Sequence, residues 1–157
     1  MMKTLLKLLK TFFSTDDAYA GFIIRVVLGL VMLAHGAQKL LGLFGGVGFF
    51  GTIESFISQG SPWIVAFLVI MGESFGALGL IVGFLTRFAA FGICTIMFGA
   101  IGLVHWTNGF FMNWFGNQTG EGFEYHILVI GMSVALMVAG AGRWSVDRAI
   151  AERIKHL

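Results

Sequence analysis

The fold is decided by the stretch AYAGFIIRVVLGLVMLAHGAQKLLGL, residues 18–43, an apolar run that Arg25, His35 and Lys39 interrupt. A helix needs about 20 mostly apolar residues to cross a bilayer core about 30 Å thick. Residues 18–43 meet that length, and so they predict a first transmembrane helix.

Three more apolar stretches follow, near residues 62–85, 88–106 and 124–142. The second begins at Pro62, a residue favoured in the first turn of a helix. The chain is 57% hydrophobic and 11% charged, whereas soluble domains are about 45–50% apolar and about 25% charged. We therefore expect an all-α membrane protein, a bundle of four transmembrane helices that occupies residues 1–157 as a single membrane domain.

An amphipathic stretch precedes the first span. In residues 2–13, Lys3, Lys7 and Lys10 fall on one helical stripe and most of the leucines on another. This pattern is typical of a helix that lies in the membrane surface with its lysines toward anionic headgroups. The same lysines interrupt the apolar run, so we expect no cleavable signal peptide.

Two further amphipathic segments lie outside the spans. Residues 47–59 carry apolar side chains at helical spacing and predict a short helix on the outer face between spans one and two. Residues 146–156 predict a C-terminal surface helix that Ser145 caps. The connection between spans three and four is rich in Phe and Trp, which predicts an aromatic belt at the membrane interface.

The basic residues indicate the orientation of the bundle. They precede span one, occupy the tight turn between spans two and three, and follow span four: Lys3, Lys7, Lys10, Arg87, Arg143, Arg148, Arg153 and Lys155. The other two connections carry none once Lys39 is assigned to the end of span one. By the positive-inside rule, both termini are expected in the cytoplasm.

Glycines in span two recur at the spacing of small-residue helix contacts. They are Gly72, Gly76, Gly79 and Gly83. Small residues at such positions let two helix backbones approach closely in a membrane. We expect them to form a helix-packing face.

Two charges deep in the predicted spans need partners, because a charge near the bilayer centre costs at least about 2.5–3.5 kcal/mol. At about 1.5 Å per residue, Arg25 lies about 9 Å from the cytoplasmic boundary and Glu73 about 13–14 Å from the same boundary. A guanidinium reaches across such a gap. The sequence therefore predicts a structural ion pair between Arg25 and Glu73 that ties span one to span two.

A second group of ionisable side chains gathers at the outer ends of the spans. It consists of His35, Lys39, His105, Glu124 and His126. His35 and Lys39 are one helical turn apart, and Lys39 continues a stripe formed by Arg25, Gly29, Met32 and Gly36. Each side chain alone is explained by snorkelling or by interfacial hydrogen bonds. Their shared depth predicts a polar pocket facing the outer leaflet, walled by Phe and Trp.

The residue types limit the chemistry of this pocket. Metal sites in bundles use Glu-x-x-His pairs, which are absent, and Glu124 and His126 lie about 200° apart around a helix. A single cysteine, Cys94, excludes an internal disulfide, a CxxC pair and c-type haem attachment. We expect no metal or haem. A quinone suits the pocket better, because His or Lys can bind its oxygens and move protons.

At these residues the chain resembles the DoxX family of small bacterial and archaeal membrane proteins. The matching elements are Arg25-x3-Gly29…His35-Gly36-x2-Lys39-x2-Gly42; Glu73-x2-Gly76-x2-Gly79-x3-Gly83-x2-Thr86-Arg87; His105-x3-Gly109-Phe110-Phe111; Gly122-Phe123-Glu124; and Gly140-Ala141-Gly142-Arg143 with Asp147. The resemblance covers about residues 19–148. It implies a four-helix membrane bundle with a link to redox metabolism, since some relatives are described as subunits of quinone-linked oxidoreductases and others with quinone or catechol resistance.

The leading hypothesis is an inner-membrane redox-associated subunit that binds a quinone or quinol. In it, His35 and Lys39 contact the ring oxygens, and Glu124 relays protons with His105 or His126. The catalytic candidates are thus His35, Lys39 and Glu124, although the chain need not turn over alone. The alternatives are a small-solute carrier or channel and a non-catalytic scaffold of a redox complex. The expected partners are membrane lipids and a redox-enzyme subunit, with a homo-oligomer left open and no nucleic acid.

Overall fold

The computed structural model describes residues 2–15 and 17–155, and all regular secondary structure in that part of the chain is helical. Two segments, η1 and η2, are turns of π-helix that continue an α-helix, and η3 is a short 3₁₀ turn. The elements are α1 (Met2–Phe12), α2 (Tyr19–Leu41), α3 (Gly48–Ser58), α4 (Trp63–Met71), η1 (Gly72–Gly76), α5 (Ala77–Val82), α6 (Thr86–Ala100), η2 (Ile101–His105), η3 (Trp106–Asn108), α7 (Glu124–Ala139) and α8 (Val146–Lys155).

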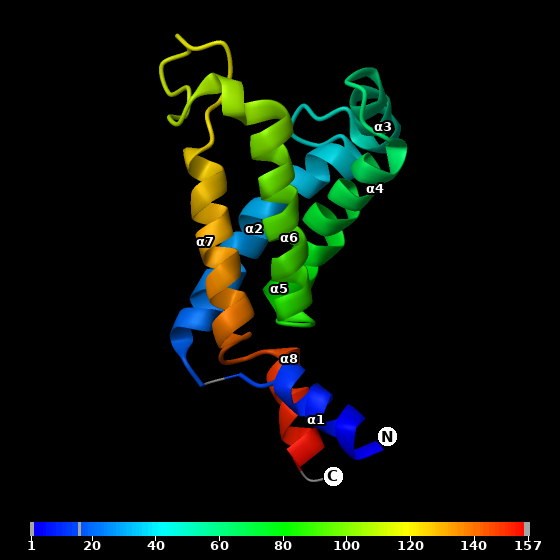
Figure 1. The fold of residues 1–157 in the computed structure, drawn as a ribbon, viewed down its shortest axis with the longest axis vertical. Helices are drawn as coiled ribbons and strands as arrows, with labels where there is room; N and C mark the ends of the chain where they lie inside the picture. Colours follow the sequence, from blue (N-terminus) through cyan, green and yellow to red (C-terminus); the bar gives the residue numbers. More distant parts are fainter. Residues whose placement is uncertain (1, 16, 156–157) are drawn as a thin grey trace.

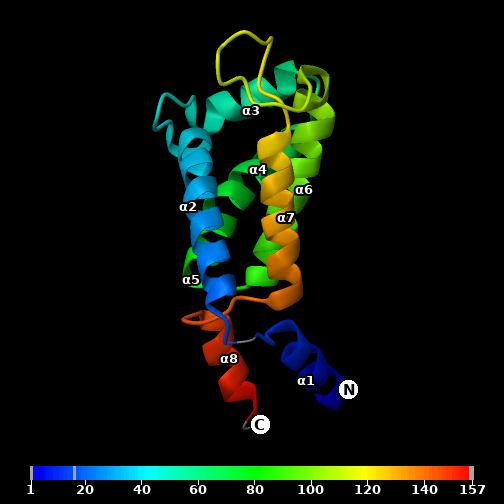
Figure 2. The same ribbon diagram turned by 90° about the vertical axis from the view of Figure 1, so that its left-hand side faces the viewer.

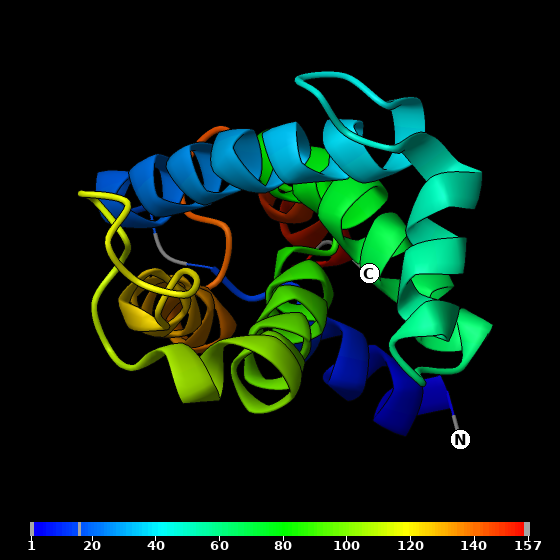
Figure 3. The ribbon, with the colours of Figure 1, turned by 90° about the horizontal axis from the view of Figure 1, so that it is seen from above.

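The long helices form an elongated bundle with two distinct ends (Figures 1 and 2). At one end, here called the terminal end, α1 and α8 lie side by side below the bundle. At the opposite end, here called the loop end, lie α3 and the irregular residues 109–123. Seen from the loop end, α2 forms one side, α6 and α7 face it, and α3 with α4 closes a third side (Figure 3).

Each of the four predicted spans contains a helix. In the described part of the chain, three helices are long and apolar enough to cross a membrane: Tyr19–Leu41, Trp63–Val82 and Thr86–Asn108. The protein is thus a helical membrane protein. The fourth, α7, has 16 residues and is shorter. A fourth crossing and the orientation of the termini stay predictions.

Helices also occupy the three predicted amphipathic segments. They are α1, α3 and α8, and the last residue of the predicted C-terminal helix, residue 156, lies outside the described residues. The predicted cap of α8 is confirmed, because the Ser145 hydroxyl accepts a hydrogen bond from the backbone N–H of Arg148 at 3.2 Å. Such a cap satisfies a backbone donor that the first turn of a helix leaves free.

Glycines on α2, rather than those on span two, allow the closest approach of helix backbones. A Cβ atom at Gly36 would lie 2.5 Å from the carbonyl oxygen of Glu73, and one at Gly29 would lie 2.9 Å from that of Ala77. Of the span-two glycines, Gly76 would place its Cβ where no heavy atom of the described chain lies within 4 Å. Gly72 and Gly83 do approach other segments closely, at Ile96 and Ser145. The close contacts to the backbone of a neighbouring helix are those of α2.

Arg25 is fully buried, and its guanidinium donates hydrogen bonds to backbone carbonyl oxygens. A guanidinium carries five N–H donors, and each has a carbonyl acceptor here. The acceptors are Ala141 for Nε (2.9 Å), Leu80 (3.0 Å) and Ile81 for Nη1, and Arg143 (3.1 Å) and Trp144 (2.7 Å) for Nη2. Arg25 thereby links α2 to the end of α5 and to the segment between α7 and α8.

The predicted Arg25–Glu73 ion pair is therefore wrong. The carbonyls at the end of a helix lack intrahelical partners and carry partial negative charge. Those at the end of α5 lie level with Arg25, so its guanidinium binds them. Glu73 lies farther toward the loop end and pairs with Lys39 instead.

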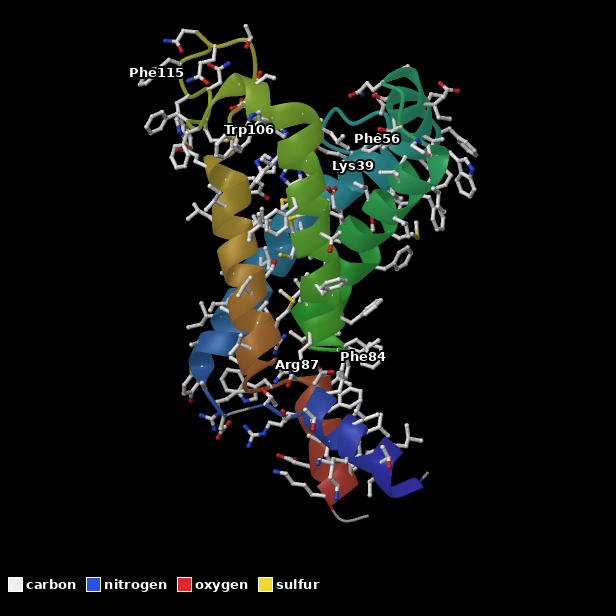
Figure 4. All side chains as sticks on the ribbon, viewed as in Figure 1. Lys39, Phe56, Phe84, Arg87, Trp106 and Phe115 are labelled. Carbon is white, nitrogen blue, oxygen red and sulfur yellow. The ribbon has the colours of Figure 1, made fainter. Side chains whose placement is uncertain are left out.

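Two more charged side chains bind the backbone at the terminal end. Both carboxylate oxygens of Asp147 accept hydrogen bonds from backbone N–H groups at the start of α6, those of Leu85 (2.8 Å) and Thr86 (2.9 Å). Arg87, labelled in Figure 4, donates to the carbonyl oxygens of Ser14 at 2.8 Å and Val138 at 2.9 Å. The terminal end is thus held together by side chains that cap helices of other segments.

Candidate functional site

A cavity of about 330 Å³ lies in the loop-end half of the bundle. Its walls come from α2, α3, α4, η1, α6, η2, α7 and the irregular residues 109–123. Half of its lining residues are aliphatic or sulfur-containing: Met32, Val65, Val69, Ile96, Met97, Ala100, Leu103, Val104 and Met112. The polar side chains that reach it are His35, Lys39, Glu73, His105, Glu121, Tyr125 and His126. An apolar pocket with a few convergent polar groups is the usual form of a small-molecule site.

An ion pair lies on one side of this cavity. The Lys39 Nζ atom is 2.6 Å from the Glu73 Oε2 atom, and the Glu73 side chain is only 5% exposed. Glu73 belongs to the π turn η1, whose extra residue changes the direction in which side chains leave the helix. Gly36 permits the carbonyl of Glu73 to approach α2 closely. Removing Lys39 would leave the buried Glu73 carboxylate without a compensating charge, which is strongly destabilising.

Two histidines lie together on another side. The ring centroids of His105 and His126 are 4.2 Å apart, and His105 Nδ1 lies 2.8 Å from the carbonyl oxygen of Glu121. His126 is only 7% exposed. Among the described residues, none provides a hydrogen-bond partner for its Nδ1 atom. A buried polar atom left without a partner costs about 1–3 kcal/mol, and His126, whose side chain lines the cavity, therefore has an unsatisfied ring nitrogen.

His35 lies near α7 on the cavity surface. Its ring centroid is 5.9 Å from that of Tyr125. Lys39, one turn farther along α2, reaches the same cavity. The cavity therefore presents a cationic and an anionic group from α2 and η1, and imidazole groups from α2, η2 and α7.

Lys39 also lines a second cavity, of about 300 Å³, at the loop end. This cavity lies between the end of α2 and α3, and Phe56 is shared by both cavities. The Thr52 hydroxyl donates to the Lys39 carbonyl oxygen at 3.2 Å and ties α3 to α2 there. Figure 4 shows Lys39 and Phe56 in the loop-end half of the molecule. Lys39 is thus accessible both from the main cavity and from the loop-end surface.

Comparison with known proteins identifies the family. The model of the DoxX family matches residues 20–106. The chain belongs to the DoxX family. The matched residues include α2, span two and α6 with η2, and so carry three walls of the cavity. A protein of Bacillus subtilis (strain 168), named “Putative oxidoreductase CatD”, is 28% identical over 114 residues, which are 73% of this chain and 75% of that protein. No solved structure gives a significant match.

Four of the five predicted site residues line the cavity of this DoxX-family protein: His35, Lys39, His105 and His126. Glu124 does not line the cavity. Its carboxylate instead accepts a hydrogen bond from the Trp114 indole at 3.2 Å. The cause is the angle of about 200° between Glu124 and His126 around a regular helix. With His126 turned toward the cavity, Glu124 turns away from it.

Of the Phe and Trp side chains expected to wall the pocket, Phe56 lines the cavity, and the rest of its apolar wall is aliphatic or sulfur-containing. Other aromatic side chains near the loop end instead point outward, and Trp114 and Phe115 are 78% and 90% exposed. Figure 4 shows Phe115 at the outer edge of the loop end. These rings lie in the irregular segment rather than on cavity-facing helix positions. The aromatic belt remains a prediction about the membrane interface.

Three ionisable residues that line the cavity were not predicted as site residues from the sequence. Glu73 was recognised as an intramembrane charge but given the wrong partner, and Tyr125 carried no signal beyond its neighbour His126. Glu121 lies in the irregular segment, where no periodicity assigns a direction. In the described part of the chain, no group of three or more His, Cys, Asp and Glu side chains is arranged to hold a metal ion.

Proposed function

We propose that this chain is the membrane subunit of a quinone-linked redox system and binds the ring of a quinone or quinol in the main cavity. The observation that carries the proposal is the buried side chain of His126, which lines an apolar cavity and whose Nδ1 atom has no hydrogen-bond partner among the described residues. The Lys39–Glu73 pair lines the same cavity from α2 and η1. Such an arrangement fits a flat apolar ring with an oxygen at each end.

Each polar group has a defined task in this proposal. Lys39 donates a hydrogen bond from Nζ to one ring oxygen, and Glu73 accepts a proton at Oε2 when that oxygen is a hydroxyl. The His126 imidazole bonds the second oxygen, and its unprotonated ring nitrogen accepts the second proton when that oxygen is a hydroxyl. A bound quinol supplies two protons and two electrons when it is oxidised, and a partner redox protein receives the electrons.

The position of Lys39 gives the protons a way out. Because Lys39 also lines the second cavity, protons can pass between Glu73 and water at the loop end. With the basic segments in the cytoplasm, as the positive-inside rule favours, the loop end faces the outer side of the inner membrane. Membership of the DoxX family and the oxidoreductase name of the Bacillus subtilis relative support a redox role.

Purification with native lipids followed by mass analysis tests whether a quinone accompanies the protein. Quinone titration of the purified protein then compares His126→Ala with Glu124→Ala, a change on the same helix outside the cavity lining. Losing one ring hydrogen bond should weaken binding about tenfold in His126→Ala. Glu124→Ala should bind like the wild type.

Two results would end the proposal. One is the absence of both co-purified quinone and saturable quinone binding. The other is unchanged affinity in both His126→Ala and His35→Ala. Uptake of a small solute into proteoliposomes that depends on Glu73, without any quinone binding, would replace it with the carrier hypothesis.

A further inference from the structure

We propose that the main cavity opens sideways between α4 and α6 into the lipid, and that its ligand is an amphiphile whose apolar tail stays in this opening. This inference rests on the proposed function and names its substrate class: a quinone with a lipid-like side chain, rather than a free ring. The opening is here called the portal. It is bounded by Val65 and Val69 on α4 and by Gly99, Leu103 and Val104 on α6 and η2.

The portal follows from side chains that belong both to the cavity and to the outer surface. Leu103 and Val104 line the cavity, yet they are 71% and 49% exposed. Gly99, one turn earlier on α6, also lines the cavity and is exposed. Because the same residues contact the interior space and the exterior, the cavity continues to the surface of the bundle at this place.

The helices diverge where the portal lies. Figure 1 shows α4 leaning away from α6 toward the loop end, after the two helices come together near η1. Near η1, a Cβ atom at Gly72 would lie 2.6 Å from the Cδ1 atom of Ile96. This contact forms the floor of the portal. One turn farther, a Cβ atom at Gly99 would have no heavy atom of the described chain within 4 Å.

The chemistry of the portal differs from that of the cavity interior. The side chains at its edge are aliphatic, and both helices belong to segments long and apolar enough to cross a membrane, Trp63–Val82 and Thr86–Asn108. Lipid hydrocarbon therefore surrounds the portal. The charged pair Lys39–Glu73 lies farther inside. A ligand that fits both the aliphatic portal and the charged pair inside the cavity has a polar ring and an apolar chain.

The two cavities at Lys39 separate two routes. The second cavity approaches Lys39 from the loop end and is lined partly by polar groups, including Gln38, Thr52 and Ser55. It suits water and protons. The portal suits a hydrocarbon chain. The geometry thus assigns ligand entry to the lipid side and proton exchange to the loop-end side.

The test narrows the portal and compares two ligands that share one ring. Gly99→Phe places a ring in the portal, and Val69→Phe does so from α4. Gly102→Phe is the matched control, because Gly102 lies on the same helix at a similar level, does not line the cavity, and has open space around its Cβ position. Binding of a polyprenyl-tailed quinone and of the same ring without its tail is measured by native mass spectrometry in lipid nanodiscs.

We expect Gly99→Phe to lower the affinity for the tailed quinone about tenfold or more and to leave the affinity for the tail-free ring unchanged. Gly102→Phe should change neither. If Gly99→Phe does not fold, Val69→Phe carries the same expectation. Unchanged tailed-quinone binding in the folded portal variants, or an equal loss for both ligands, would overturn the portal. A wild-type protein that binds neither ligand would instead overturn the proposed function.

Discussion

Replacing Arg25 by lysine should destabilise the bundle strongly while conserving the charge. The guanidinium donates five hydrogen bonds to carbonyl oxygens, whereas an ammonium group has three donors. At least two carbonyls therefore lose their partner. Hydrogen bonds from a charged donor are worth about 1.5–3 kcal/mol each, so Arg25→Lys should lower the free energy of unfolding by about 3–6 kcal/mol.

The chain carries its own probe for this measurement. Cys94 is the one cysteine of the sequence and is only 7% exposed. A thiol-reactive fluorogenic dye therefore reports unfolding in detergent as Cys94 becomes accessible. A loss of 3 kcal/mol or more corresponds to a fall in melting temperature of about 6 °C or more.

A change below about 1 kcal/mol in Arg25→Lys would refute the reasoning, because it would mean that the five hydrogen bonds contribute little. The same assay checks the corrected pairing. Within the described part of the chain, Arg25 and Glu73 share no hydrogen-bond or ion-pair partner. The effects of Arg25→Lys and Glu73→Gln should therefore add within about 0.5 kcal/mol. A larger coupling would restore the ion pair that depth alone predicted.

Three further predictions are checked with the same unfolding assay, and the third also with hydrogen exchange. Lys39→Met and Glu73→Gln should show an interaction energy of about 1–3 kcal/mol in a double-mutant cycle, and strict additivity would contradict their pairing. Gly36→Ala should cost about 1–3 kcal/mol because its Cβ meets the backbone of η1, whereas Gly76→Ala should change stability by less than about 1 kcal/mol; equal effects would show that α2 does not need the close approach. Asp147→Ala should cost about 1–2 kcal/mol and speed hydrogen exchange at the two backbone N–H groups that open α6, and unchanged protection there would contradict the capping role.

Part of the candidate site could be predicted from sequence because it depends on helical spacing. His35 and Lys39 are four residues apart, so they had to lie on nearly the same face of one helix. Arg25, Gly29 and Met32 continue that face and are buried. Spacing of this kind is a property of the α-helix itself and needs no knowledge of the neighbouring helices.

The partners of the charged residues could not be predicted in this way. Depth placed Arg25 and Glu73 within reach of each other, but depth says nothing of side-chain direction. The π turn that contains Glu73 changes that direction. Arg25 donates to carbonyl oxygens at the end of α5 and beyond α7. These two segments come close to each other only when the bundle is assembled.

Helical spacing also predicts no side-chain directions in the irregular segment. Residues 109–123 bring Glu121 to the cavity and the Trp114 indole to Glu124. Both contacts depend on how a non-periodic chain turns back on itself. No helical or strand period assigns a direction to its side chains.

The apolar run with Arg25, His35 and Lys39 by itself determined that this chain is a helical membrane protein. In hydrocarbon, backbone N–H and C=O groups must bond within the segment, so a long apolar run has to be a helix. Only the tertiary structure decided what the three polar side chains do. Arg25 binds helix-end carbonyls, while Lys39 pairs with Glu73 beside His35 at the cavity. The rotation of α2 sets the directions of its three polar side chains, and the π turn η1 sets that of Glu73.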